Sequence, residues 1–333
     1  MTRSIIVAAL LAGAAPTLAA GPLPPTGPAP DPNAPSSVLG PVLPPVLPPG
    51  VIGAPAGTGR WPAVAEARAD AKGYTVYHPA RMPAERLPLV LWGNGGCKDN
   101  GLSASHFLRE VASHGYFVVA NGAPRAERPV LAALPAGGGR QPGALSITVA
   151  DETTVAHLLA AIDWARAADR AGPFAGRIDT GRIAVMGHSC GGLQTIAAAA
   201  DPRISTAVVY DSGIYNVPHE VPGRMHLDKS DLKRLHTPIA YVLGGQADIA
   251  YANGDDDVRR IDTVPVFYAN LPVGHGGTFQ LADGGDWAKL GVAWLDWQLK
   301  HVAIAGHQFT DQDCILCRDP RWTIVRKQFP GSP

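Results

Sequence analysis

Short runs of apolar residues alternate along this chain with longer segments that have helical periodicity. The runs are continuously apolar rather than alternating, which is typical of strands buried on both faces of a parallel sheet. They predict strands at Gly73–Tyr77, Leu87–Trp92, Tyr116–Ala120, Ile183–Met186, Ala207–Tyr210, Ile239–Leu243 and Val264–Tyr268. Helices are predicted at His106–His114, from Thr148 to about Arg170, and at Leu193–Ala200, Asp256–Ile261 and Trp287–Val302. Ala63–Ala71 is expected to be a short helix or an irregular segment. This order predicts a single α/β domain, residues 58–333, with helices on both faces of a mostly parallel sheet.

The N-terminal part of the chain has a different pattern. Residues 1–20 combine Arg3, an apolar run from Ile5 to Ala15 and small residues near Ala20, as in a cleavable secretory signal peptide. Residues 21–57 are rich in proline and glycine, a composition that blocks helices and sheet ladders and favours a disordered linker. We therefore expect a protein that is secreted or periplasmic, in a compartment where cysteines pair.

Composition narrows the function classes. The 333 residues have a formal net charge of zero and no basic stripe, which argues against nucleic-acid binding. The apolar run at the N-terminus is too short for a membrane span. We expect the protein to be a monomer. The glycines of the loop predicted to be mobile at Arg125–Gln141 follow no strand directly, and Asp255–Asp257 match no ligand spacing. We therefore expect neither a cofactor nor a metal, and read the three aspartates as a solvated helix start.

The chemistry centres on Arg182–Ala200, where Gly187-His188-Ser189-Cys190-Gly191 matches G-x-S-x-G between a predicted strand and a predicted helix. A serine hydroxyl is a weak nucleophile until a base activates it, and a sharp strand-to-helix turn exposes it to one. Glycines two positions before and after the serine are needed because a Cβ there would collide with neighbouring backbone. Ser189 is the predicted nucleophile, with a surface loop that carries a chance serine as the alternative.

Two later loops supply a base and an acid. Asp248 follows the strand Ile239–Leu243, and His275 follows Val264–Tyr268, so the order is Ser189, Asp248, His275, as in an α/β-hydrolase. Asp211 is the rival acid, since it directly follows another predicted strand. Among the other histidines, His188 is expected to pack rather than react, and His301 and His307 to be surface or capping residues.

The oxyanion hole needs two N–H groups aimed at the developing charge. Cys190, directly after the nucleophile, supplies one, and the turn Gly95-Gly96-Cys97 supplies the other, at Gly96. A disulfide between Cys97 and Cys190 would pin these two turns together, and two free packed thiols are an equally weighted alternative. Cys314 and Cys317 are expected to form a local structural disulfide.

Residues Arg177–Gly192, Val111–Ala120, Thr237–Asp248 and Val292–Leu299 resemble secreted α/β-hydrolases of the cutinase, polyester-hydrolase and chlorophyllase type over about residues 58–305. The resemblance implies serine-esterase chemistry with Ser189, Asp248 and His275, and an oxyanion hole at Gly96 and Cys190. In the polyester hydrolases an aromatic residue usually stands where this chain has Gly96, and methionine where it has Cys190. Their substrate-stacking tryptophan falls near Gly213–Ile214, where Tyr215 is the closest aromatic, so Tyr215 and Gly95 are the substrate-binding candidates. The insertion Val217–Asp231 has no clear counterpart in that family.

The sequence thus predicts a secreted serine carboxylesterase that acts on short or medium acyl esters or on polyesters. An acyltransferase or peptidase on the same fold is an alternative, and so is a catalytically silent binding module. The presence of Ser189, Asp248 and His275 in the order of a triad argues against a binding module, because binding alone does not require these three residues.

Overall fold

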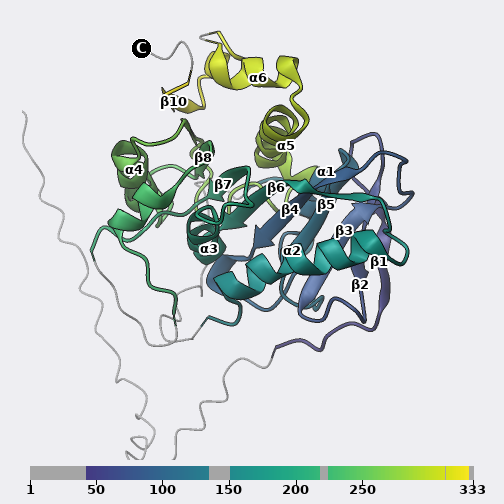
Figure 1. Ribbon diagram of the computed structural model, residues 1–333. Coiled ribbons are helices and arrows are strands. Elements are labelled where there is room, and N and C mark those ends of the chain that lie inside the picture. Colours follow the sequence, from purple (N-terminus) through teal and green to yellow (C-terminus); the bar gives the residue numbers. More distant parts are fainter. Residues whose placement is uncertain (1–42, 135–150, 218–223, 312, 330–333) are drawn as a thin grey trace, which may run out of the picture. The chain divides into compact units, whose positions relative to one another are not determined.

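The protein is represented by a computed structural model that describes residues 43–134, 151–217, 224–311 and 313–329 (Figure 1). The predicted signal peptide, most of the predicted linker, the glycines of the 125–141 loop and Thr148 lie outside these residues. The strands are β1 Gly50–Ala56, β2 Ala63–Ala67, β3 Tyr74–Pro79, β4 Leu87–Gly93, β5 Phe117–Asn121, β6 Ile178–His188, β7 Thr206–Tyr210, β8 Ile239–Leu243, β9 Val266–Asn270 and β10 Thr323–Lys327. The α-helices are α1 Ser105–Ser113, α2 Val155–Arg170, α3 Cys190–Ala198, α4 Tyr251–Arg260, α5 Gly285–Lys300, α6 Ala303–Thr310 and α7 Ile315–Arg318. Short 3-10 turns are η1 Gly95–Cys97, η2 Lys229–Arg234 and η3 Ala282–Gly284.

One mixed sheet organises the described chain, with strand order β1-β2-β3-β5-β4-β6-β7-β8-β9-β10. The run from β5 to β9 is parallel, and antiparallel pairs lie on both sides of it: β1, β2 and β3 on one, β10 on the other. The chain is therefore a single α/β domain with a mostly parallel sheet, as predicted.

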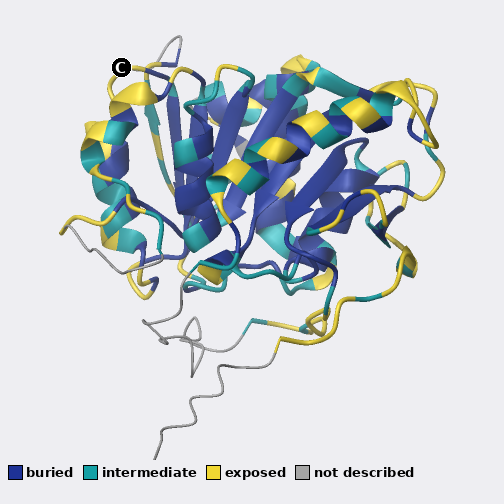
Figure 2. Ribbon diagram, turned by 60° about the horizontal axis from the view of Figure 1, so that its bottom comes forward, coloured by how far each residue is buried: buried dark blue, intermediate teal, exposed yellow. Residues whose placement is uncertain are grey.

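Helices cover both faces of the sheet, and each face has its own hydrophobic core. Side chains of α1, α5 and α6 pack on one face, where Phe107, Trp294 and Phe309 are fully buried. Side chains of α2, α3 and α4 pack on the other, with Leu158 and Ile196 among them. Figure 2 shows the result: the central strands of the sheet are buried, and the helices are exposed along their outer sides.

The structure corrects the sequence interpretation at the edges of the sheet. Gly50–Ala56, placed in the predicted disordered linker, is the edge strand β1, and Val51 pairs with Glu66 of β2. Ala63–Ala67, expected to be helical or irregular, is β2. The chain after α5, for which no element was predicted, adds two helices and the edge strand β10. The helix expected to start near Thr148 begins at Val155, where the Thr154 side chain accepts a hydrogen bond from the N–H of His157.

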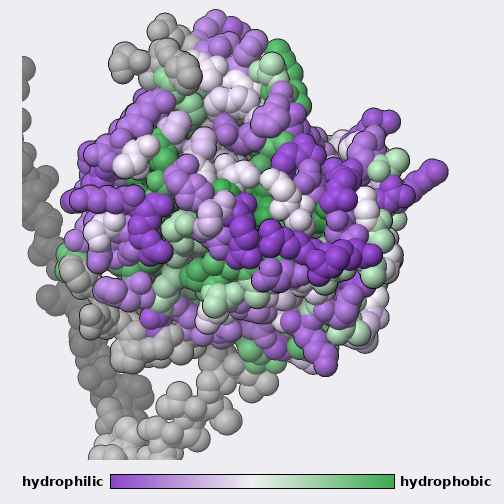
Figure 3. All heavy atoms as spheres, viewed as in Figure 1, coloured by the Kyte–Doolittle hydropathy of each residue, from purple (hydrophilic) through white to green (hydrophobic). Residues whose placement is uncertain are grey.

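The face seen in Figure 3 is mostly hydrophilic, with hydrophobic residues in small areas. Within the described residues, no helix combines the length and the apolar character needed to cross a membrane.

Candidate active site

Ser189 sits in a strained turn between β6 and α3. Its backbone has φ 54° and ψ −120°, outside the regions that a residue with a side chain ordinarily adopts. A Cβ on Gly187 would lie 2.2 Å from the carbonyl oxygen of Gly191, and one on Gly191 would lie 2.1 Å from that of Gly93. The backbones of β4, β6 and α3 therefore meet too closely for any residue but glycine, which is the collision predicted from the motif.

The structure brings Ser189, His275 and Asp248 together from three separate loops. The Nε2 atom of His275 lies 2.9 Å from Ser189 Oγ, and its Nδ1 atom lies 2.6 Å from Asp248 Oδ1. Ser189 follows β6, Asp248 follows β8 and His275 follows β9. These strands are parallel, so their carboxyl ends meet at one edge of the sheet, where ligands bind in open α/β folds.

Asp248 is held as an ionised acceptor. Its side chain is buried, and it also accepts from the N–H of Ala250 at 2.8 Å and of Gly244 at 3.3 Å. Burial raises the pKa of this carboxyl, but the hydrogen bond from His275 and the charge on that ring lower it more, so the pKa lies below its ordinary value. The carboxylate can therefore orient the imidazole with its proton on Nδ1.

His188 packs beneath the site, as expected from the sequence. Its Nε2 lies 2.7 Å from the carbonyl oxygen of His275, so Nε2 carries the proton and donates it. Burial, and then the neighbouring His275, lower the pKa of His188 to about 3, so the ring is neutral. A Cβ on Gly95 would lie 2.5 Å from His188 Nδ1, so the ring fills the space between the Gly95 turn and the His275 loop.

The turn η1 lies beside the start of α3. Gly96 has φ +64°, a left-handed conformation that suits glycine. Within the described chain, the backbone N–H groups of Cys97 and Lys98 bond back to Asn94 and Gly95, while those of Gly95 and Gly96 have no backbone acceptor. The N–H of Cys190 belongs to the first turn of α3, which has no partner inside the helix. The turns that carry the two predicted donors, Gly96 and Cys190, are linked by the disulfide between Cys97 and Cys190.

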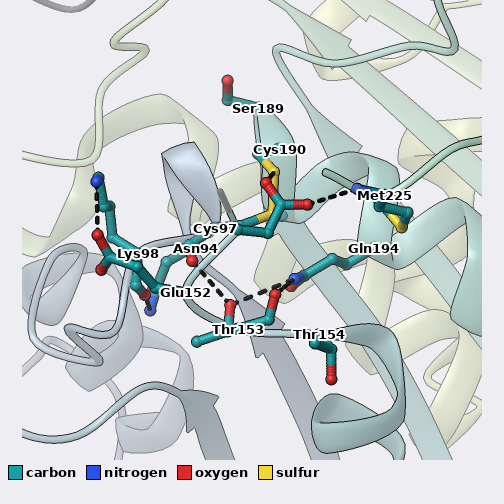
Figure 4. The surroundings of a disulfide bond; sticks show 12 residues. Asn94, Cys97, Lys98, Glu152, Thr153, Thr154, Ser189, Cys190, Gln194 and Met225 are labelled. Carbon is teal, nitrogen blue, oxygen red and sulfur yellow. Dashed lines mark hydrogen bonds and ion pairs between the residues drawn. A yellow bond between two sulfur atoms is a disulfide. The ribbon is translucent and has the colours of Figure 1, made fainter. Parts of the chain in front are cut away.

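The disulfide Cys97–Cys190 is present, with 5.2 Å between the Cα atoms. Cys314 and Cys317 form the second disulfide, and no free cysteine remains. Both pairings were predicted, and the alternative of two free thiols at Cys97 and Cys190 is wrong. Figure 4 shows the first disulfide directly below Ser189.

Residues 151–154, which the sequence did not single out, hold η1 in place. The carbonyl oxygen of Cys97 accepts from the backbone N–H groups of Glu152 and Thr153 at 3.1 and 3.0 Å, and from Thr153 Oγ1 at 3.1 Å. The Glu152 carboxylate pairs with Lys98 Nζ at 2.6 Å, and the Gln194 amide of α3 donates to the Thr153 carbonyl (Figure 4). Nothing in the sequence marks residues 151–154 for this role, because they precede α2 without a motif of their own.

The acidic run of α4 is not a solvated helix start. Asp257 is fully buried and accepts from the N–H of Ile214 at 2.8 Å, from Tyr241 and from Lys229. Asp255 and Asp256 pair with arginines of the same helix. Asp257 therefore holds the loop after β7 to α4, and the solvated interpretation is wrong for this residue.

The remaining sequence candidates stay predictions. Tyr215 is 43% exposed on the loop after β7, and its role in substrate binding and that of Gly95 remain predictions. His301 caps the C-terminal end of α5 and His307 is exposed in α6, as expected. Two groups of potential metal ligands occur among the described residues: Cys97, Asp151 and Cys190, whose sulfurs are bonded to each other, and His188, Asp211 and His275. The second group shares its histidine with the candidate triad.

Comparison with known proteins adds no family to this picture: no protein-family model and no curated protein matches the chain.

Proposed function

We propose that this chain is a serine hydrolase of the α/β-hydrolase type that cleaves carboxylic esters. The observation that carries the proposal is the continuous hydrogen-bond path from Ser189 Oγ through the His275 ring to the Asp248 carboxylate. A strained serine, an imidazole in contact with it and a buried acid behind the imidazole are what nucleophilic acyl transfer requires.

The chemistry follows from these contacts. His275 Nε2 takes the hydroxyl proton as Ser189 Oγ bonds to the ester carbonyl carbon, and returns it to the leaving alcohol when the C–O bond breaks. Water then attacks the acyl carbon as His275 takes a proton from the water; the acyl C–O bond to Ser189 breaks, Oγ recovers the proton from His275, and the carboxylic acid leaves. Asp248 stabilises the imidazolium at each stage.

The N–H groups of Gly96 and Cys190 are proposed to hold the oxyanion of the tetrahedral intermediates. Each such donor is worth roughly 3–4 kcal/mol in the transition state. Gly96 has no side chain of its own to cover this N–H group.

Export is part of the same proposal. The two disulfides are stable in an oxidising compartment, and the N-terminal sequence has the pattern of a secretory signal.

A fluorophosphonate probe tests the proposal without knowledge of the natural ester, because it phosphonylates an activated serine. We expect one adduct per chain, on the peptide that contains Ser189, and none in Ser189→Ala. A folded protein that forms no adduct would favour the silent binding module. Ester product formed when an added alcohol competes with water would extend the activity to acyl transfer.

A further inference from the structure

Asp211 is a buried carboxyl group that the proposed mechanism does not use. It follows β7 directly, has φ +43° and is completely inaccessible to solvent. Neither of its side-chain oxygens makes a hydrogen bond of ordinary geometry to a donor among the described residues, although the N–H of Gly244 is near enough to lower its pKa. A buried carboxylate without a donor is strongly unfavourable, so this group needs an explanation.

His188, the histidine nearest to Asp211 in the described chain, does not offer it a positive charge. His188 Nε2 lies 3.6 Å from Asp211 Oδ2, but its proton points to the His275 carbonyl and its ring is neutral. Ring nitrogens of His188 and His275 and an oxygen of Asp211 lie within 4.8 Å of one another. The charge of Arg128 also lowers the pKa of His188.

The second carboxyl group of the site stands next to Asp211. Both groups flank Gly244: the position of a Cβ on this glycine lies 3.1 Å from Asp211 Oδ1, and its N–H donates to Asp248 Oδ2. Burial first, and then the charge of Asp248, raise the pKa of Asp211 well above its ordinary value. Where two buried carboxyl groups are neighbours, the charge of one raises the pKa of the other, and Asp248 is the one that contacts a cationic partner during catalysis.

We propose that Asp211 is a positioning residue: it stays a neutral acid and donates its hydroxyl hydrogen to the carboxylate of Asp248. The Asp248 carboxylate then has donors on every side, namely His275, Ala250, Gly244 and Asp211. It is held in one orientation toward the base. The catalytic role of Asp211 rests on the proposed function, whereas its protonation state does not.

The protonation state is measured on the unmodified protein. With aspartate labelled by ¹³C at the side-chain carboxyl, an NMR titration follows each carboxyl carbon. We expect one aspartate to keep the chemical shift of a neutral acid above neutral pH, and that signal to be absent in Asp211→Asn. Asp257, whose pKa burial raises to about 6, titrates lower and is separate. If every aspartate carbon is ionised above neutral pH, or if the neutral signal persists in the variant, the proposal is overturned.

Kinetics separate positioning from packing. Asn keeps the size, the neutrality and one donor, so Asp211→Asn should keep kcat/KM within about threefold and leave the acidic limb of its pH profile in place. Asp211→Ala should lower kcat about tenfold or more, with KM nearly unchanged. If Asp211 were ionised, Asp211→Asn would remove a negative charge near His275 and move the acidic limb to lower pH, which would contradict the proposal. If the wild type shows no esterase activity, the proposed function fails, and the NMR titration still decides the protonation state.

Discussion

Cys97 and Cys190 connect the turn after β4 with the first residue of α3, across 93 positions of the sequence. The bond joins the two backbone segments whose N–H groups are proposed to hold the oxyanion. Neither segment is fixed by a long helix or strand of its own at this point, because η1 has three residues and α3 only begins here. The disulfide is therefore expected to affect both stability and turnover.

The double variant Cys97→Ser/Cys190→Ser tests this directly. Closing a loop of this length restricts the unfolded chain by about 4–5 kcal/mol, so the free energy of unfolding should fall by a large part of that amount. We also expect kcat to fall about tenfold or more, since the two oxyanion donors lose their fixed spacing. Denaturant unfolding and steady-state ester hydrolysis measure the two effects.

The matched control is Cys314→Ser/Cys317→Ser. This pair closes a loop with a sequence separation of three and lies in the C-terminal segment between α6 and β10. It should lose much less stability and keep kcat. Equal kcat in both double variants would contradict the positioning role of the Cys97–Cys190 bond.

Asp248→Asn should lower kcat by about 10⁴-fold while the protein stays folded, because the amide offers an N–H to Nδ1 and favours the wrong tautomer of His275. Asp255→Asn is the control. Asp255 pairs with Arg259 on the surface of α4, where an ion pair contributes about 0–1 kcal/mol, so neither activity nor melting temperature should change appreciably. An Asp248→Asn enzyme within tenfold of the wild type would assign the acid elsewhere.

Gly95→Ala should disturb the site without touching the triad. The added methyl group would lie 2.5 Å from His188 Nδ1, and the His188 ring also holds the carbonyl of His275. We expect kcat/KM to fall at least tenfold. The control is the double variant Gly95→Ala/His188→Ala, in which the obstructing ring is absent. If the clash causes the loss, kcat/KM of the double variant should be little lower than that of Gly95→Ala alone.

Asp257 makes the stability depend on pH. The folded protein keeps the Asp257 proton up to about pH 6, whereas the unfolded chain releases it near 3.8, so in this window the folded state binds more protons. The free energy of unfolding therefore decreases as pH rises from about 4 to 6, by up to about 3 kcal/mol from this group. Denaturant unfolding of wild type and Asp257→Asn at several pH values checks this. The variant should have a flatter profile in that window, and an identical slope would contradict the assignment.

The sequence predicts the centre of the sheet well and its edges poorly. The strands β4, β5, β7, β8 and β9 and the segment Ile183–Met186 of β6 are mostly apolar because both faces of the sheet are covered there, and this pattern can be recognised within each short run. In contrast, β1 is solvent-exposed over most of its length, follows a proline-rich stretch and is defined by its pairing with β2. β10 likewise pairs only with β9, after two short helices. Pairing with a distant strand leaves no periodic signal in such a segment.

The same distinction applies to the site. Ser189 and its glycines are marked by a motif, because backbone crowding at the turn excludes other residues. Glu152 and Thr153 hold η1 mainly through backbone N–H groups, which any sequence provides. The burial of Asp211 and Asp257 depends on how distant loops pack, so their side chains gave no sign of it.

The central claim is that Ser189 is an activated nucleophile toward esters. The most direct measurement is the steady-state hydrolysis of p-nitrophenyl esters from acetate to palmitate by the wild type and by Ser189→Ala. We expect hydrolysis by the wild type, with a chain-length optimum that reports the length of the acyl pocket, and a loss in the variant on the order of 10⁶-fold in kcat. A folded wild type that hydrolyses none of the esters, or a variant that hydrolyses them equally well, would contradict it.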